Sequence, residues 1–192
     1  MTLTAIVLAA GQGSRFRAET GEDKLLAQCS GRDGVTRPVI EHVLLNLPEQ
    51  LVSRLLVTSP ERSDVIRLAR AYGCEVVLLQ SAGMGDSIAA AIAASASADG
   101  WLVVLGDMPF VLPATIERVI DDLQSINVPV HAGQRGHPVA FGRAFGPSLM
   151  ALTGDRGAKP LFAQAAVKQV PVNDAGVLWD VDVPQGLSFN AD

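Results

Sequence analysis

The sequence predicts an α/β protein with a mostly parallel sheet and helices on both faces. Four continuous apolar runs lack period-two alternation, as expected of strands that are covered on both sides. Between them lie segments whose apolar residues recur at helical spacing. This alternation of buried strands and amphipathic helices is typical of parallel sheets in which each crossover connection is a helix.

The elements of the first part of the chain follow in order from this pattern. The expected strands cover residues 3–10, 54–58, 75–79 and 101–105. The expected helices carry apolar stripes over residues 39–47, 65–69, 88–95 and 116–123. Pro38 and Pro113 suit the first turns of two of these helices. The N–H groups of a first turn have no partner within the helix, so the N–H that proline lacks is not missed there. Gly73 suits a helix end.

After residue 126 the alternation loosens. Residues 128–132 and 137–141 are expected to form two short strands across a glycine-rich turn. A short helix over about residues 159–166 and strands near 167–172 and 177–181 complete the chain. The last third is therefore expected to add a hairpin and an edge to the main sheet.

Composition limits the function classes. The 192 residues are 48% hydrophobic, which predicts a single folded domain and excludes intrinsic disorder. A net charge of −5 argues against a surface for nucleic acid or anionic membrane. Cys29 and Cys74 have neither CxxC nor disulfide spacing, so we expect core thiols in a reducing cytoplasm. The apolar run Thr4–Ala10 is too short for a signal-peptide core or a membrane span.

The loop after the first strand is a candidate phosphate site. Gly11 and Gly13 allow tight turns and a close approach of backbone N–H groups to phosphate oxygens. Arg15 adds a planar charged fork and Lys24 a point charge. Phe16 stands where a dinucleotide fingerprint needs its third glycine, and no P-loop pattern is present. A plain strand-to-helix turn is the alternative.

Two aspartate motifs suggest a cation. Asp107 follows a buried strand, at the same sheet edge as the first loop, and a carboxylate facing phosphate needs a hard cation between them. Mg²⁺ is the natural occupant. Asp180 and Asp182 project to one side of an expected strand, from which a second carboxylate could reach the same cation. A turn-forming or capping role for Asp107, and a solvated strand end for the other two, remain alternatives.

Three glycine-rich motifs complete the set of candidates. In Gly83-Met84-Gly85-Asp86-Ser87, bare backbone suits the edge of a nucleobase, although Asp86 or Ser87 as a helix N-cap explains the motif equally well. His137-Pro138 and the segment 154–159 are weaker signals, since Asp155 also suits a helix cap and a lone histidine is more often structural. Met84 and Met108 are expected to pack.

Together the motifs resemble a known family. The ordered motifs are LAAGQGSRF, DKLL, GMGDSI, GDMPF, GHPVAF, GDRGAK and DVDVP. They span Leu8 to Pro184 and resemble the molybdenum-cofactor cytidylyltransferases and related nucleotidyltransferases. The resemblance implies a Rossmann-like, three-layer, nucleotide-diphospho-sugar transferase-like fold. It also implies a nucleotide-binding half over about residues 1–125 and an acceptor-binding half over about 126–192.

The resemblance also implies site residues. Arg15, Lys24 and Asp107 would be catalytic, and Asp107 and Asp182 would bind Mg²⁺. His137 and Pro138 would lie on the acceptor side. The residues expected to bind the nucleotide are Ala9, Ala10, Gly11, Gly13, Ser14, Arg15, Lys24, Gly83, Met84, Ser87 and Asp107. One departure is the lengthened segment Cys29–Arg37, which is expected to border the crevice and to bear on the acceptor.

The function that we expect is transfer of CMP from CTP to the terminal phosphate of a molybdopterin-type cofactor, with release of pyrophosphate. A molybdoenzyme client would be a further partner, with no role for nucleic acid or membrane. A guanylyltransferase using GTP and a cytidylyltransferase for another phosphorylated acceptor are alternatives. A non-catalytic molybdenum-cofactor carrier and a nicotinamide oxidoreductase are alternatives from other classes.

Overall fold

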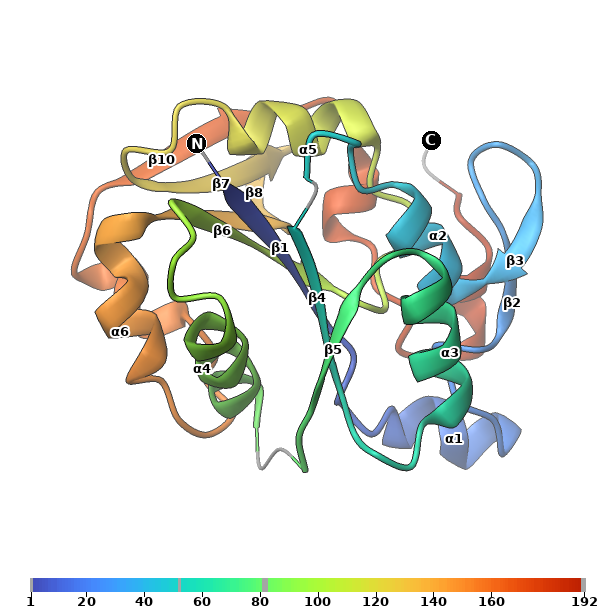
Figure 1. Cartoon of the computed structure of the whole chain (residues 1–192). Coiled ribbons are helices and arrows are strands. Elements are labelled where there is room, and N and C mark those ends of the chain that lie inside the picture. Colours follow the sequence, from blue (N-terminus) through green and yellow to red (C-terminus); the bar gives the residue numbers. More distant parts are fainter. Residues whose placement is uncertain (1, 52, 81–82, 191–192) are drawn as a thin grey trace.

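The computed structural model describes residues 2–51, 53–80 and 83–190, which form a central sheet flanked by helices (Figure 1). The strands are β1 (Leu3–Leu8), β2 (Gln28–Ser30), β3 (Thr36–Pro38), β4 (Ser53–Thr58), β5 (Glu75–Leu78), β6 (Gly100–Leu105), β7 (Ile126–His131), β8 (Gln134–Arg135), β9 (Val139–Gly142) and β10 (Val167–Pro171). The α-helices are α1 (Ser14–Thr20), α2 (Val39–Leu45), α3 (Ser63–Ala71), α4 (Met84–Ala94), α5 (Pro113–Ile120) and α6 (Gly146–Met150). Four 3₁₀ turns, counted over the same residues, are η1 (Arg143–Phe145), η2 (Lys159–Ala163), η3 (Ala175–Leu178) and η4 (Pro184–Leu187).

The main sheet confirms the predicted α/β class. Within the described residues it has eight strands in the order β10-β7-β9-β6-β1-β4-β5, with β8 paired to β7. β1 runs parallel to β4 and β6, and β4 runs parallel to β5. The strands and helices predicted before residue 126 correspond to β1, β4, β5, β6, α2, α3, α4 and α5.

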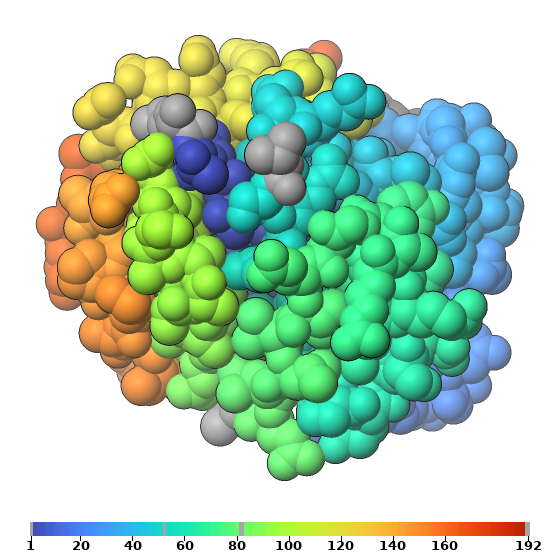
Figure 2. All heavy atoms as spheres, viewed as in Figure 1, coloured from blue at the N-terminus to red at the C-terminus, as the bar shows by residue number. Residues whose placement is uncertain are grey.

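The core lies on both faces of the sheet. Side chains of Ala5 and Val7 from β1 join one apolar cluster with α2, α3 and α5. Ile6, which points to the other face, joins a second cluster with α4 and α6. In Figure 2 the dark-blue atoms of the first residues show only as a small patch between neighbouring segments. Burial on both sides explains why the strand reads as a continuous apolar run.

The last third departs in part from the prediction. β7 and β8 form the hairpin across Gly133, β10 forms the expected edge, and β9 inserts between β6 and β7 as an antiparallel strand. The expected helix near 159–166 is the 3₁₀ turn η2. The expected strand at 177–181 is wrong. There the Asp174 side chain accepts a hydrogen bond from Gly176 N and begins η3, after which the chain is irregular.

Two helices begin directly after a glycine. Gly13 has φ 57°, a left-handed conformation that glycine adopts readily, and it begins α1, the helix that the strand-to-helix alternative for this loop implies. The α4 helix begins at Met84 with Gly83 as its N-cap and no side-chain cap, so neither Asp86 nor Ser87 caps it. Among the described residues, none of the helices is long and apolar enough to cross a membrane.

Candidate functional site

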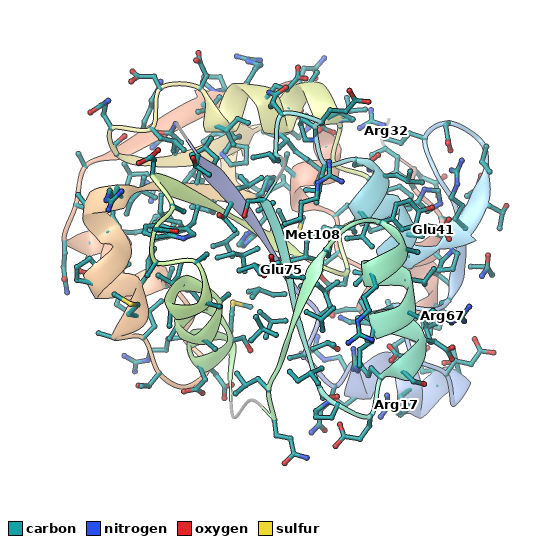
Figure 3. All side chains as sticks on the ribbon, viewed as in Figure 1. Arg17, Arg32, Glu41, Arg67, Glu75 and Met108 are labelled. Carbon is teal, nitrogen blue, oxygen red and sulfur yellow. The ribbon has the colours of Figure 1, made fainter. Side chains whose placement is uncertain are left out.

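The carboxyl ends of β1 and β6 bring two of the predicted motifs together. Gly106 N donates to Leu8 O at 2.9 Å, directly after the paired strands end. A Cβ at Gly106 would lie 2.8 Å from Leu8 O, so only glycine permits this approach. Asp107 therefore stands beside the loop that follows β1. The next residue, Met108, is buried among core residues near the centre of the molecule, as predicted (Figure 3).

A cleft of about 430 Å³ opens at this edge of the sheet. Its lining combines the loop after β1, Lys24, Asp107 and the start of α4. The residues that line it are Leu8, Ala9, Ala10, Gly11, Gln12, Lys24, Leu25, Gly83, Met84, Ser87, Leu105, Asp107 and Asp155. Of the eleven residues expected to bind the nucleotide, eight line this one cleft, although they lie far apart in sequence. They are Ala9, Ala10, Gly11, Lys24, Gly83, Met84, Ser87 and Asp107, whereas Gly13, Ser14 and Arg15 do not line it.

Lys24 is the buried cation of the cleft. Its Nζ lies 2.5 Å from Asp107 Oδ2 and 3.0 Å from Asp182 Oδ1, and its side chain is 10% exposed. Burial by itself lowers the pKa of Lys24, but attraction to Asp107 and hydrogen bonds to both aspartates outweigh it and raise the net pKa. Lys24 therefore stays charged and holds the two carboxylates together.

Asp180 and Asp182 reach Asp107 through a backbone contact. Val181 N donates to Asp107 O at 2.9 Å, which sets the carboxy-terminal segment against the loop after β6. As a result, one carboxylate oxygen each of Asp107, Asp180 and Asp182 lie within 4.8 Å of one another. Octahedral Mg²⁺ holds oxygens at about 2.0–2.1 Å, which places them roughly 3–4 Å apart. The three side chains therefore fit a hard divalent cation.

The crowding of these carboxylates has an electrostatic cost. Burial, followed by repulsion from Asp182 and Asp107, raises the pKa of Asp180. A bound cation would relieve that repulsion, which is a second indication of fit. The sequence analysis took Asp182 as the ligand, and the structure adds Asp180 from the same motif.

The start of α1 lies at the rim of the site. Arg15 is exposed and its NH1 lies 3.2 Å from Asp182 Oδ2. Gly13 does not line the cleft but packs against the Lys24 stem, where a Cβ would meet Lys24 Cδ at 3.2 Å. Neither Ser14 nor Arg15 is among the residues that line the cleft.

The glycines of the Gly83–Ser87 motif permit a close approach between two loops. Gly85 N donates to Gly154 O at 2.7 Å, and a Cβ on Gly83 would lie 2.3 Å from the Gly154 carbonyl carbon. This packing brings the segment that contains Asp155 to the cleft. Met84, which was expected to pack and also to bind the nucleotide, is 41% exposed and contributes to the cleft wall.

A second pocket of about 460 Å³ adjoins the cleft and shares Met84 and Asp155 with it. Its floor is apolar, with Ile88, Val103, Val128, Val139, Phe141, Ala158 and Phe162. Its polar wall carries Arg135, His137, Arg156 and Lys159. His137 was expected on this side of the site, whereas Pro138 is buried and is not among the lining residues.

The imidazole of His137 has an unmatched polar atom. Its Nδ1 is buried and has no hydrogen-bond partner among the described residues. Burial lowers the pKa of His137, the nearby Asp107 opposes that change, and Lys159 adds to it. His137 therefore lines this pocket as a ring whose neutral form is favoured, with its buried Nδ1 unpartnered among the described residues.

Arg62 supports the first loop, although the sequence analysis did not single it out. Its NH1 donates to Ala9 O at 2.9 Å, and its NH2 donates to Gly11 O. Its Nε lies 3.4 Å from Asp23, the residue before Lys24, and the side chain is 9% exposed. Arg62 thus ties two carbonyls of the loop to the segment that contains Lys24. The sequence feature that could have indicated Arg62 is its position just past the carboxyl end of β4, at the same sheet edge as the first loop.

The lengthened segment Cys29–Arg37 does not border the cleft. It contains β2 and β3, which pair as a separate two-stranded hairpin beside the carboxy-terminal segment (Figure 1). Its residues line a different pocket of about 520 Å³ together with Leu187–Phe189. The expectation that this segment bears on the acceptor is therefore not supported by its place in the fold.

Comparison with known proteins agrees with this geometry. Residues 5–170 match the family model described as "MobA-like NTP transferase domain". The chain belongs to this family. It is a nucleotidyltransferase domain, as the sequence motifs predicted.

This chain matches a small part of some relatives and nearly the whole length of others. The chain is 30% identical over 146 residues to the bifunctional protein GlmU of Sphingopyxis alaskensis, covering 73% of this chain and 31% of that protein. It thus spans about a third of the length of such curated relatives. The crystal structure of Rv0371c from Mycobacterium tuberculosis H37Rv has a TM-score of 0.77 at 30% identity, covering 97% of this chain and 95% of that one.

Two further structures extend the comparison. Rv0371c in complex with manganese matches with a TM-score of 0.76 at 28% identity, covering 97% of this chain and 96% of that one. Molybdopterin-guanine dinucleotide biosynthesis protein A from Archaeoglobus fulgidus matches with a TM-score of 0.68 at 20% identity, covering 96% and 94%. The latter shows the shared fold.

Arg62→Ala is expected to weaken nucleoside triphosphate binding by about 10- to 100-fold, because two loop carbonyls lose charge-assisted hydrogen bonds worth about 1.5–3 kcal/mol each. Arg62→Lys is expected to be intermediate. Arg67, an exposed residue of α3 that pairs with Asp64, provides the matched control (Figure 3). Titration calorimetry measures the affinities for CTP and GTP, and nucleotide binding to Arg62→Ala at wild-type strength would contradict the role of Arg62.

The lowered pKa of His137 predicts a pH-dependent stability. The unfolded state takes up a proton near the ordinary histidine pKa of 6.5, and the folded state does so only at lower pH. The free energy of unfolding is therefore expected to fall as pH decreases through 6.5. Denaturant unfolding at a series of pH values should show a weaker decrease in His137→Asn. An identical pH dependence in the two proteins would show that His137 titrates normally.

Proposed function

We propose that this protein transfers CMP from CTP to the terminal phosphate of a molybdopterin-type cofactor and releases pyrophosphate, with Mg²⁺ as cofactor. The observation that carries the proposal is the convergence of Lys24, Asp107 and the loop Leu8–Gln12 in one cleft. Exposed loop backbone and a buried ammonium group suit a triphosphate. Family membership supports the same chemistry.

The proposed division of labour follows the two pockets. The cleft, which residues 1–125 line except for Asp155, takes the nucleotide, and its wall near Gly83–Ser87 faces the base and ribose. The adjoining pocket takes the acceptor, and it belongs largely to residues 126–192. Its apolar floor suits a ring system, whereas Arg135, Arg156 and Lys159 suit a phosphate. Met84 and Asp155 lie where the two pockets meet, which is where the reacting groups must come together.

In the proposed reaction, an oxygen of the acceptor phosphate forms a bond to the α-phosphorus of CTP. The bond from that phosphorus to the bridging oxygen of the β-phosphate breaks, and pyrophosphate leaves with the electron pair. The acceptor phosphate is already anionic, so no side chain needs to remove a proton. Catalysis is therefore positioning and charge stabilisation.

Each charged residue has a part in this scheme. Lys24 offsets charge on the triphosphate, and Arg15 at the rim offsets charge on the departing pyrophosphate. Asp107 and Asp182, with Asp180 beside them, would hold the metal ion. When bound, Mg²⁺ would supply Lewis-acid stabilisation of the phosphoryl oxygens. The manganese complex of Rv0371c supports a divalent cation on this fold.

The setting and partners belong to the same proposal. Cys29 and Cys74 are free and buried, and burial raises the pKa of Cys29 to about 11, so neither is poised for oxidation. Such thiols suit a cytoplasmic protein. A molybdoenzyme client would receive the product.

One assay determines both the base of the nucleotide and the identity of the acceptor. Pyrophosphate release is measured with CTP or GTP, each with molybdopterin or with a sugar or polyol phosphate, in the presence of Mg²⁺. The proposal expects release with CTP and molybdopterin. Release with GTP alone would indicate a guanylyltransferase, release with another acceptor would change the substrate, and cofactor binding without release would indicate a carrier.

Asp107→Asn is expected to lower turnover by at least about 100-fold, the range seen when one group that stabilises transition-state charge is removed. The fold should persist, because Asp107 O rather than its side chain holds Val181. Asp64→Asn on the surface of α3 is the control. Near-normal Mg²⁺-dependent turnover in Asp107→Asn would overturn the metal assignment.

A further inference from the structure

The hairpin formed by the lengthened segment contacts the rest of the fold through Arg32. The Arg32 NH1 lies 2.6 Å from Asp174 Oδ1 and 3.2 Å from Phe110 O. Its guanidinium carbon also lies 5.0 Å from the centre of the Phe189 ring. Figure 3 shows Arg32 on the side of the molecule that carries this hairpin. The planar cation thus joins the hairpin to three other segments at once.

Asp174, the partner of Arg32, is a buried charge with a complete set of donors. Its side chain is 1% exposed. Besides Arg32, it accepts hydrogen bonds from Leu112 N at 2.9 Å, Thr115 Oγ1 at 2.8 Å and Gly176 N at 3.0 Å. A buried carboxylate is tolerated only when it is paired and hydrogen-bonded. Arg32 supplies the one positive charge among these donors.

The residues that contact Asp174 and Arg32 lie close in sequence to the candidate metal ligands. Leu112 and Phe110 follow Asp107, and Gly176 lies in η3, which precedes Asp180. A Cβ at Gly176 would lie 2.1 Å from Phe110 O, so these two segments are in direct backbone contact. The next contact along both segments is Val181 N with Asp107 O.

Aromatic packing makes the same connection. The rings of Phe110 and Phe189 stack with centres 4.7 Å apart, and Trp179 lies edge-on to both. Trp179 is the residue before Asp180. The guanidinium of Arg32 covers the outer side of this cluster, on Phe189.

We propose that Arg32 is a positioning residue for the metal centre. By neutralising Asp174 and covering Phe189, it fixes the segment before Asp180 against the segment after Asp107, so that the carboxylates of Asp107, Asp180 and Asp182 stay within reach of one cation. The hairpin thereby acts on the reaction through the metal ligands and not through the acceptor. The cation-binding part of this inference rests on the proposed function, whereas the positioning of Val181 against Asp107 does not.

The test compares Arg32→Ala, Arg32→Lys and Arg37→Ala in the full chain. Arg37 is the matched control, because it lies in the same hairpin with the same charge, and its ion pair within the described residues is with the exposed Asp33. Two quantities are measured without nucleotide or turnover. They are the affinity for Mn²⁺, by electron paramagnetic resonance, and the exchange rate of the Val181 amide hydrogen, by nuclear magnetic resonance.

Arg32→Ala is expected to weaken Mn²⁺ binding about 10- to 100-fold, the range for residues that orient metal ligands from outside the coordination shell. The Val181 amide should exchange faster, Arg32→Lys should be intermediate, and Arg37→Ala should match the wild type. Because Arg32→Ala leaves Asp174 buried without a cation, the double variant Arg32→Ala/Asp174→Asn is included. It should recover stability and still bind Mn²⁺ weakly.

Failure of the positioning role of Arg32 can be distinguished from failure of the proposed metal centre. Wild-type Mn²⁺ affinity and wild-type Val181 exchange in a folded Arg32→Ala variant would overturn the positioning role. Equal weakening in Arg37→Ala would also overturn it, since the effect would then be one of general charge. If the wild type does not bind Mn²⁺ while Val181 exchange responds to Arg32→Ala, the proposed metal centre fails and the contact between the two segments stands.

Discussion

Three carboxylates and one lysine meet at the carboxyl ends of β1 and β6, and the surrounding structure keeps them there. Asp107, Asp180 and Asp182 repel one another, and burial together with this repulsion raises the pKa of Asp180. Lys24, which is more buried than these carboxylates, pairs with Asp107 and Asp182 and offsets only part of the negative charge. Such an arrangement persists only where backbone contacts hold the carboxylates in place, and it is suited to a ligand that brings both a cation and phosphate.

The backbone contacts around this charge cluster depend on glycine. Gly106 lets the end of β6 approach Leu8 O, and Gly176 lets η3 approach Phe110 O. Gly83 and Gly85 do the same for the loop at Gly154. The glycine-rich motifs of this chain therefore serve two purposes, since most of them permit loop-to-loop packing and only some leave backbone free to face a ligand. A motif with a complete packing explanation can still form the wall of a site.

The parts of the structure that could be predicted are those set by local pattern. Burial on both faces makes β1, β4, β5 and β6 continuous apolar runs, and parallel strands bring Asp107 to the loop after β1. Arg62 was not predictable, because its partners are carbonyls 53 and 51 residues away. Asp174 is an ordinary loop aspartate in sequence, and only the fold buries it. The strand expected at 177–181 failed for a related reason: Val177 and Val181 are buried by contacts of η3 and of the irregular chain after it, without any strand pairing.

A crystal structure of the protein with CTP and Mn²⁺ tests the central claim most directly, because the anomalous signal of manganese locates the cation independently of the nucleotide. The account predicts manganese in contact with Asp107 and Asp182, and the triphosphate on the loop Leu8–Gly13 beside Lys24. Manganese bound away from Asp107, or a triphosphate that does not contact that loop, would contradict it.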